Sequence, residues 1–125
     1  MSNPSDLKYS KEHEWARVDG KTVVIGITTF AAEQLGDVVY VDLPAKGAEI
    51  KQFAKFGEIE SVKTVSDLFA PVGGKVVAVN DAVKDDPAVV NSDTYGEGWL
   101  IKVEVSDPKQ FDALMDASAY ESHIS

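Results

Sequence analysis

The sequence contains no cysteine, which excludes a disulfide framework, a zinc–thiolate site, an iron–sulfur cluster and a thiol nucleophile. Basic residues are also scarce, because 12 lysines and arginines stand against 21 aspartates and glutamates, giving a formal net charge of −9 at pH 7. Such a charge repels nucleic-acid phosphates and anionic lipid surfaces. We therefore expect protein partners with basic faces, and neither nucleic acid nor a membrane.

Long apolar runs are absent as well. No stretch approaches the roughly 20 apolar residues that a helix needs to cross a bilayer. The N-terminal segment MSNPSDLKYSKEHEW has neither the apolar core of a signal peptide nor the arginine-rich pattern of a transit peptide. These features predict a cytoplasmic bacterial protein and leave open a mature mitochondrial form.

The residue patterns of common enzymes are also missing. The chain has only two histidines, His13 and His123, and neither stands in the spacing of a histidine-based metal site. It contains no nucleophile elbow, phosphate-binding loop or dinucleotide fingerprint. The sequence therefore predicts no metal site, no catalytic residue and no enzymatic activity of its own.

What is present is a series of short strands separated by turns. A length of 125 residues predicts one domain over 1–125. Local signals predict a hairpin over 14–27 that turns at Asp19-Gly20, and then a helix over 28–36 that starts at Thr28 or Thr29 and stops at Gly36. A buried strand is predicted over 37–47, and at least three strands within 58–80. A helical turn at 87–90 and an alternating strand over 98–105 follow. This pattern indicates a mainly β fold, either a small sandwich or a flattened barrel.

The last segment, 106–125, is predicted to be helical. Asp107 is expected to cap it, Pro108 suits the first helical position, and Gln110 would complete a capping box. The apolar stripe facing the core would consist of Phe111, Leu114 and Met115.

One lysine stands near the tip of a predicted hairpin, in the segment EIESVKTVSDLF. Lys63 is flanked by small or β-branched residues, and the arms of the hairpin carry apolar residues that can anchor it in the core. A solvated surface lysine is the simplest interpretation. A lysine on a rigid, protruding turn also suits acylation, which removes its charge and adds a long arm.

Four segments resemble the glycine cleavage system H protein family. The segment IESVKTVSDLFAPVGGKVVAVN is similar to the family's lipoylation segment, in which the lysine of Glu-Ser-Val-Lys bears lipoate. The segments LKYSKEHEW, GITTFAAEQLGDVVYVDLPAKG and VVNSDTYGEGWLIKV resemble family segments in the same order. The resemblance covers the chain from Leu7 to about Tyr120.

The resemblance implies the barrel-sandwich hybrid of lipoyl and biotinyl carriers, with short helices that include a C-terminal helical segment. It implies a non-catalytic carrier that moves the aminomethyl group of glycine on a lipoyl arm. The implied partners are the glycine decarboxylase (P protein), the aminomethyltransferase (T protein) and the dihydrolipoyl dehydrogenase (L protein). A lipoate ligase, or an octanoyltransferase with a lipoyl synthase, would modify the chain, which we expect to be a monomer.

The implied cofactor is covalent lipoate on Lys63. Glu60 and Ser61, just before that lysine, are predicted to be read by the modifying enzyme. Glu14 and Asp67 are predicted to bind the amine of the loaded arm, whereas Glu12 is interpreted as an ordinary surface acid. Phe30 and Gln34 depart from the polar or histidine residues that the family often has in this helix, which could alter partner contacts.

Three other functions are alternatives to a glycine cleavage carrier. A biotin carrier normally has methionines beside its lysine, whereas Val62 and Thr64 flank Lys63. A lipoyl domain of a 2-oxo acid dehydrogenase complex usually has aspartate before the lysine and belongs to a longer chain. The third alternative is an H-like protein that donates lipoate in a relay to other enzymes.

Overall fold

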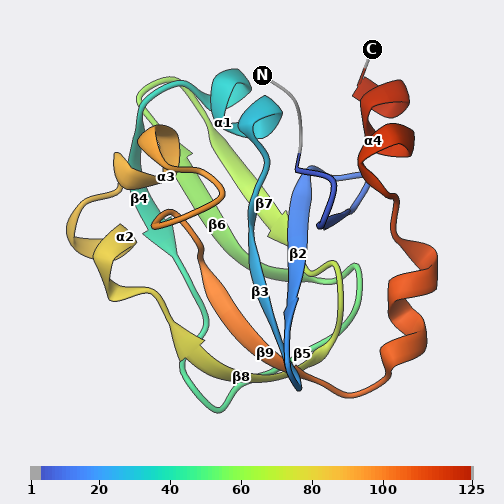
Figure 1. Cartoon of the computed structure of the whole chain (residues 1–125). Helices are drawn as coiled ribbons and strands as arrows, with labels where there is room; N and C mark the ends of the chain where they lie inside the picture. The colour runs from blue at the N-terminus through green and yellow to red at the C-terminus, as the bar shows by residue number, and fades with distance from the viewer. Residues whose placement is uncertain (1–3, 125) are drawn as a thin grey trace.

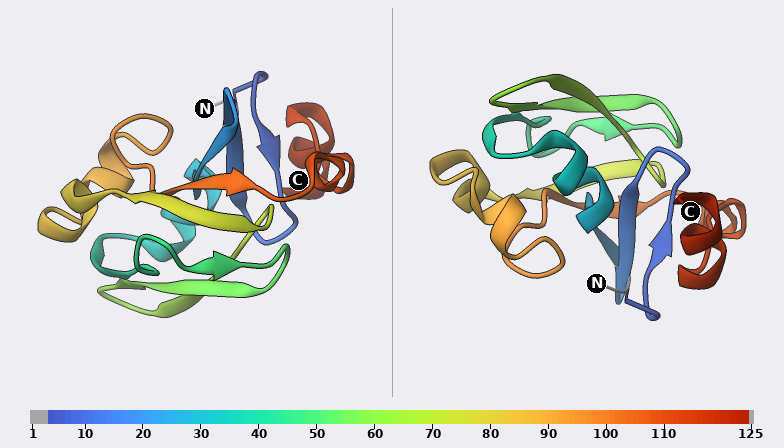
Figure 2. Two further views of the ribbon diagram at one scale, coloured as in Figure 1. Left: turned by 90° about the horizontal axis from the view of Figure 1, so that it is seen from below. Right: turned by 90° about the horizontal axis from the view of Figure 1, so that it is seen from above.

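The computed structural model describes residues 4–124, whose strands form two sheets. The larger sheet has the strand order β1-β2-β3-β9-β8-β5, and the smaller has the order β4-β6-β7. The strands are β1 (Lys8–Tyr9), β2 (Glu14–Asp19), β3 (Thr22–Ile27), β4 (Val38–Asp42), β5 (Glu49–Ile50), β6 (Lys55–Ser61), β7 (Val65–Phe69), β8 (Gly74–Val79) and β9 (Ile101–Val105). Figure 2 shows β8 and β9 stacked as a layer over the small sheet.

Short helices lie around the two sheets (Figure 1). They are α1 (Thr29–Leu35), α2 (Asp81–Asp85), α3 (Val89–Ser92), the 3-10 helix η1 (Pro108–Ala113) and α4 (Ala117–Ile124). Within residues 4–124, none of these helices has the length and apolarity that a membrane crossing requires. The expected mainly β architecture, with short helices and a helical C-terminal segment, is confirmed.

The main core lies between the inner faces of the two sheets. Ile25 and Ile101 of the large sheet are completely buried, and Ile59 and Leu68 of the small sheet are buried almost as fully. Burying an isoleucine or leucine side chain contributes about 1.5–3 kcal/mol. Because Ile59 and Leu68 lie on β6 and β7, these residues fasten both arms of the lysine hairpin to the core.

A second apolar cluster attaches α4 to the larger sheet. The rings of Tyr9 and Tyr120 stack with centroids 4.8 Å apart, and both side chains are fully buried. Trp15 packs in the same cluster and donates its indole N–H to the carbonyl oxygen of Thr94 at 3.2 Å. The C-terminal helix is therefore an integral part of the packing beside β1 and β2.

Helix α1 has the predicted ends. Thr28 is its N-cap, and its hydroxyl accepts the N–H of Ala31 at 3.2 Å. Gly36 is the C-cap, with φ at +78° and ψ at −154°, a backbone conformation that is almost restricted to glycine. The prediction of a helix over 28–36 is confirmed.

Two strand predictions need correction. The pairing of Asp19 with Thr22 makes Gly20-Lys21 the hairpin loop, one residue later than predicted, and Gly20 has the positive φ, +65°. The strand predicted to be buried over 37–47 is β4, an edge strand of the small sheet. Its two faces are unequal, because Val41 is buried whereas Tyr40 is 57% exposed.

The predicted C-terminal helix is interrupted. Its cap is correct, since the Asp107 carboxylate accepts the N–H of Lys109 at 3.0 Å. The chain leaves η1 and extends at Met115, which exchanges two backbone hydrogen bonds of 2.8 Å with Tyr9, and only then forms α4. The capping box is wrong, because the Gln110 side chain accepts the N–H of Gly73 at 2.7 Å instead.

The predicted apolar stripe of Phe111, Leu114 and Met115 is only half-buried. The helical turn expected at 87–90 corresponds to α3, shifted slightly along the chain. Helix α2 was not predicted. Asn80 caps it by accepting the N–H of Ala82 at 3.1 Å, a signal that the sequence does contain.

The approach of β4 to β6 depends on Gly57. A Cβ on this residue would lie 2.2 Å from the carbonyl oxygen of Asp42 on β4. Because backbone cannot move aside cheaply, Gly57→Ala should lower the free energy of unfolding by about 2–3 kcal/mol. The measurement is urea unfolding, with the exposed strand substitution Lys75→Ala as control; equal stability of the two variants would contradict this prediction.

Candidate functional site

Lys63 lies in the tip that joins β6 and β7, at residues 62–64. Ser61 holds this tip from inside: its hydroxyl oxygen accepts the N–H of Thr64 at 3.1 Å and that of Lys63 at 3.3 Å. The Ser61 N–H donates to the carbonyl oxygen of Thr64 at 2.8 Å. Ser61 is only 6% exposed, so its hydroxyl serves the turn rather than an open surface.

The tip is held from outside by the segment that follows α1. The N–H of Val62 donates to the carbonyl oxygen of Asp37 at 3.1 Å. The side chain of Asn91 fixes the residues on either side of Asp37, because it donates to the Gly36 carbonyl at 2.8 Å and accepts the Val38 N–H at 2.9 Å. Sequence reasoning did not single out Asn91, since its two partners lie more than 50 residues away.

The side chain of Lys63 passes close to Gly36. A Cβ on Gly36 would lie 3.4 Å from Lys63 Cε and 3.9 Å from Nζ. Among residues 4–124, no hydrogen bond or ion pair engages Lys63 Nζ. The amine is therefore exposed on a tip that is fixed from both sides, next to the end of α1 (Figure 1).

A cleft of about 390 Å³ opens beside this tip. Its walls are residues from the β1–β2 loop, α1 and β7. The lining residues are Glu12, His13, Glu14, Ile27, Phe30, Ala31, Gln34, Leu35, Ile59, Thr64, Val65, Ser66, Asp67 and Leu68. The lining includes Glu14 and Asp67 and also Phe30 and Gln34, the two departures from the family pattern. Asp67 pairs across the sheet with Glu58, so its side chain lies on the face of the hairpin opposite to the buried Ile59, and the two carboxylates do not face each other.

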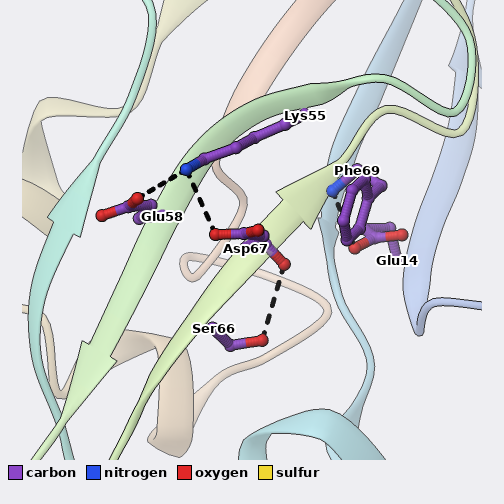
Figure 3. A network of polar contacts seen from close by, with 6 residues as sticks. All are labelled: Glu14, Lys55, Glu58, Ser66, Asp67 and Phe69. Carbon is purple, nitrogen blue, oxygen red and sulfur yellow. Dashed lines mark hydrogen bonds and ion pairs between the residues drawn. The ribbon is translucent and has the colours of Figure 1, made fainter.

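Glu14 is enclosed, with only 1% of its surface exposed. Its carboxyl group accepts the hydroxyl of Ser10 at 2.5 Å and the backbone N–H of Phe69 at 3.2 Å, the latter drawn in Figure 3. Burial raises the pKa of Glu14 to about 8, although both hydrogen bonds act in the opposite direction. Near neutral pH the side chain is therefore mostly an uncharged carboxylic acid.

Asp67 has a different environment. Its carboxylate forms an ion pair with Lys55 Nζ at 3.2 Å, and Lys55 also contacts Glu58 at 2.6 Å (Figure 3). These two acids raise the pKa of Lys55. The side chains of this network are roughly half exposed, so the pairs contribute little to stability. The Asp67 carboxylate thus engages Lys55 on the outer face of the β6–β7 hairpin, whereas the Glu14 carboxyl group is enclosed.

His13, which has no metal-binding spacing in the sequence, lines the cleft. Its Nδ1 lies 2.8 Å from the hydroxyl of Tyr120, and that hydroxyl lies 2.7 Å from the hydroxyl of Thr28, the cap of α1. Burial, and then the neighbouring His123, lowers the pKa of His13. This network ties α4, the β1–β2 loop and the start of α1 together around one wall of the cleft.

Comparisons with known proteins agree on one family. Residues 7–125 match the family model described as "Glycine cleavage H-protein". The chain belongs to the glycine cleavage H-protein family. It is 57% identical over 123 residues to the glycine cleavage system H protein of Symbiobacterium thermophilum, covering 98% of this chain and 96% of that one. It is 58% identical over 117 residues to the Myxococcus xanthus protein of the same name, covering 94% and 91%.

A solved structure of the family has the same fold. The glycine cleavage system H protein of Mycobacterium marinum superposes with a TM-score of 0.88 at 41% identity, and the match covers 98% of each chain. The expected barrel-sandwich hybrid is confirmed. Membership in the H-protein family does not test individual residues, so the assignments of Lys63, Glu60, Ser61, Glu14 and Asp67 stay predictions.

The buried carboxyl of Glu14 should make stability depend on pH. Since its pKa is about 8 when folded and about 4.5 when unfolded, the unfolded chain releases this proton first as pH rises. The Glu14 contribution to stability should therefore fall between pH 4.5 and 8, by about 1.4 kcal/mol for each pKa unit of difference.

Glu14→Gln keeps the shape and removes the titration. The melting temperature of the Gln variant should thus rise relative to wild type as pH is raised from 5 to 8. Calorimetry at matched ionic strength provides the measurement, with Glu104→Gln as the exposed control. A difference between wild type and Glu14→Gln that stays constant with pH would show that Glu14 is already ionised in the folded protein.

Proposed function

We propose that this chain is the lipoyl carrier of the glycine cleavage system, with lipoate joined to Nζ of Lys63 through an amide bond. The observation that carries the proposal is a lysine on a doubly anchored hairpin tip, whose Nζ has no polar partner among residues 4–124, in a chain of the glycine cleavage H-protein family. The proposed carrier is not a catalyst itself. It works in the bacterial cytoplasm as a single domain and a monomer.

The site fits an attached arm. Lys63 Nζ is accessible to an acyl donor, and the cleft beside the tip provides about 390 Å³ into which an arm can fold. The lipoyl group would supply a disulfide that takes up the aminomethyl group and is later reoxidised. The chain's own residues would position this arm, shelter what it carries and present it to partner enzymes.

The proposed partners follow from this role. They are the glycine decarboxylase that loads the arm, the aminomethyltransferase that unloads it, and the dihydrolipoyl dehydrogenase that reoxidises it. A lipoate ligase, or an octanoyltransferase with a lipoyl synthase, would attach the group, and we propose that Glu60 and Ser61 help this enzyme to recognise the tip. Ser61 would act indirectly, because its hydroxyl shapes the turn, whereas Glu60 is exposed.

Membership in the H-protein family favours this role over a lipoyl domain of a 2-oxo acid dehydrogenase complex. A lipoate donor in a relay would use the same Lys63. Glycine-dependent exchange of carbon dioxide with a purified glycine decarboxylase separates the two roles, because only the carrier of the cleavage system should support it.

The attachment site can be tested by mass. Lys63→Arg preserves the positive charge and should preserve the fold, but a guanidinium group does not accept this acylation. Intact-mass analysis after incubation with a lipoate ligase, lipoate and ATP should show one added lipoyl group on the wild type and none on the Arg variant. Lys55→Arg, on the same hairpin, is the control and should be modified normally; a lipoylated Lys63→Arg variant would refute the assignment.

We also propose that Glu14 and Asp67 bind the amine of the loaded arm. Both are among the residues that line the cleft, but the Glu14 side chain is buried whereas that of Asp67 is about half exposed. An ammonium group that enters the cleft would favour the ionised form of Glu14, so its binding should expel a proton from this residue. Asp67 is already charged and would share its carboxylate between Lys55 and the incoming amine.

This pairing should protect the cargo from hydrolysis. An aminomethyl group bound to sulfur can release formaldehyde and ammonia in water, and a partly desolvated ion pair holds it in the cleft. Glu14→Gln with Asp67→Asn should accelerate spontaneous formaldehyde release roughly tenfold if about 1.4 kcal/mol of protection is lost. The rate is measured on the loaded carrier without the aminomethyltransferase, with Glu104→Gln, at an exposed residue of β9 outside the cleft lining, as control. A release rate that the double substitution leaves unchanged would remove both carboxylates from this role.

A further inference from the structure

Exposed apolar side chains gather around the lysine tip. Six large apolar residues are exposed within residues 4–124. Four of them lie on the tip itself or on the strand ends beside it: Val39, Tyr40, Val62 and Val65, which are 49–69% exposed. The clustering of exposed apolar residues at one end of a small sheet is typical of a surface that binds another protein.

The strand register shows how this surface is built. Tyr40 on β4 pairs with Glu60 on β6, and Glu60 pairs with Val65 on β7, so the three side chains form one row across the small sheet. Because alternate residues of a strand share a face, this row lies on the outer face, away from Ile59 in the core. We call Val39, Tyr40, Glu60, Val62 and Val65 the tip face.

The next row on the same outer face is acidic. Asp42, Glu58 and Asp67 lie side by side across β4, β6 and β7, and Lys55 pairs with the last two. Glu60, by contrast, has no ion pair with any residue in the range 4–124. A partner would therefore meet apolar side chains with an uncompensated carboxylate among them and more acid beside them.

The position of Lys63 decides which partner must use this face. An enzyme that acylates the lysine has to hold Nζ about 3–3.5 Å from the acyl carbon, so it must touch the residues next to the tip. Enzymes that act on the loaded arm meet its far end instead and can bind at a distance from the tip. The tip face is thus required by the acylation step and not by the later steps.

We propose that the tip face is the docking surface for the enzyme that acylates Lys63, and that this enzyme presents apolar side chains with a lysine or arginine opposite Glu60. The inference rests on the proposed function of Lys63 and adds the surface and the chemistry of the partner. Tyr40 and Val65 supply the apolar contacts on either side of Glu60. The charge of Glu60 makes the encounter sensitive to salt.

The test is the kinetics of acyl transfer to the unmodified full-length chain. Tyr40→Thr with Val65→Thr removes the apolar contacts and keeps residues that suit a strand. With a purified lipoate ligase, lipoate and ATP, KM for this variant should rise roughly tenfold or more, whereas kcat changes less than about twofold. Val18→Thr, at a residue 61% exposed on β2, is the matched control and should behave as wild type.

Two further measurements separate docking from damage to the tip. Labelling of Lys63 by a small reagent, acetic anhydride, should be equal in wild type and the double variant, because no docking is involved. Glu60→Gln should raise KM at low salt and reduce its dependence on salt concentration. A wild-type KM for the Tyr40/Val65 variant, or the same rise in KM for Val18→Thr, would overturn the proposal.

The later partners provide the final comparison. Once lipoylated at high ligase concentration, the single variant Tyr40→Thr, which leaves the lining of the cleft intact, should have the KM of wild type with the glycine decarboxylase. An equal loss with the decarboxylase would overturn the assignment of the face to the acylating enzyme. If the wild-type chain is not modified on Lys63 at all, the carrier function fails; if it is modified and the Tyr40/Val65 variant keeps the wild-type KM, only the docking surface fails.

Discussion

The hydrogen bond from the N–H of Val62 to the carbonyl oxygen of Asp37 joins the lysine tip to the end of α1. Without it, residues 62–64 would be held by the turn that Ser61 organises and by the pairing of Ser61 with Val38 at the base of the tip. The bond requires the segment after α1 to keep one conformation, and Asn91 imposes it by binding both Gly36 and Val38. An acylation site needs this kind of order, because an enzyme recognises a fixed shape more strongly than a mobile one.

The glycine at the end of α1 links the same region to the helix. Its backbone conformation is one that other residues avoid, and it leaves room for the lysine stem to pass at van der Waals distance. Helix α1 supplies a wall of the cleft, so the tip, the stem and the cleft share one support. The proposed site at Lys63 is therefore assembled from α1, α3 and the β6–β7 hairpin, segments that are far apart in the sequence.

Much of the fold could be predicted from local signals. The caps at Thr28 and Asp107 follow from side chains that bind nearby N–H groups, and the hairpin with Lys63 at its tip follows from alternating strands. The incorrect predictions have two causes: a hydrogen-bond partner that is distant in the sequence, and the position of a strand within its sheet. Gln110 forms no capping box because its side-chain oxygen accepts the N–H of Gly73 instead. Strand β4 is half exposed because it lies at the edge of the small sheet.

The candidate site was predictable to a lesser degree. Lys63 stands out through its hairpin and the family resemblance, whereas the role expected for Glu14 and Asp67 stays a prediction, since both residues line the cleft but the Asp67 carboxylate engages Lys55. The sequence alone does not reveal that Glu14 is buried and uncharged, since one of its partners is a backbone N–H 55 residues away. The role of Asn91 could not be predicted either, because both hydrogen-bond partners of its side chain are more than 50 residues away in the sequence.

The hydroxyl of Tyr120 connects the C-terminal helix α4 to residues near the cleft. It bonds to the cap of α1 and to His13, the second of which lines the cleft. Removing α4, or unfolding it by fusing a bulky tag nearby, would take away this hydroxyl and expose the rings of Tyr9 and Trp15 to water. A change at the C-terminal end of the chain would thus reshape the wall of the cleft beside Lys63.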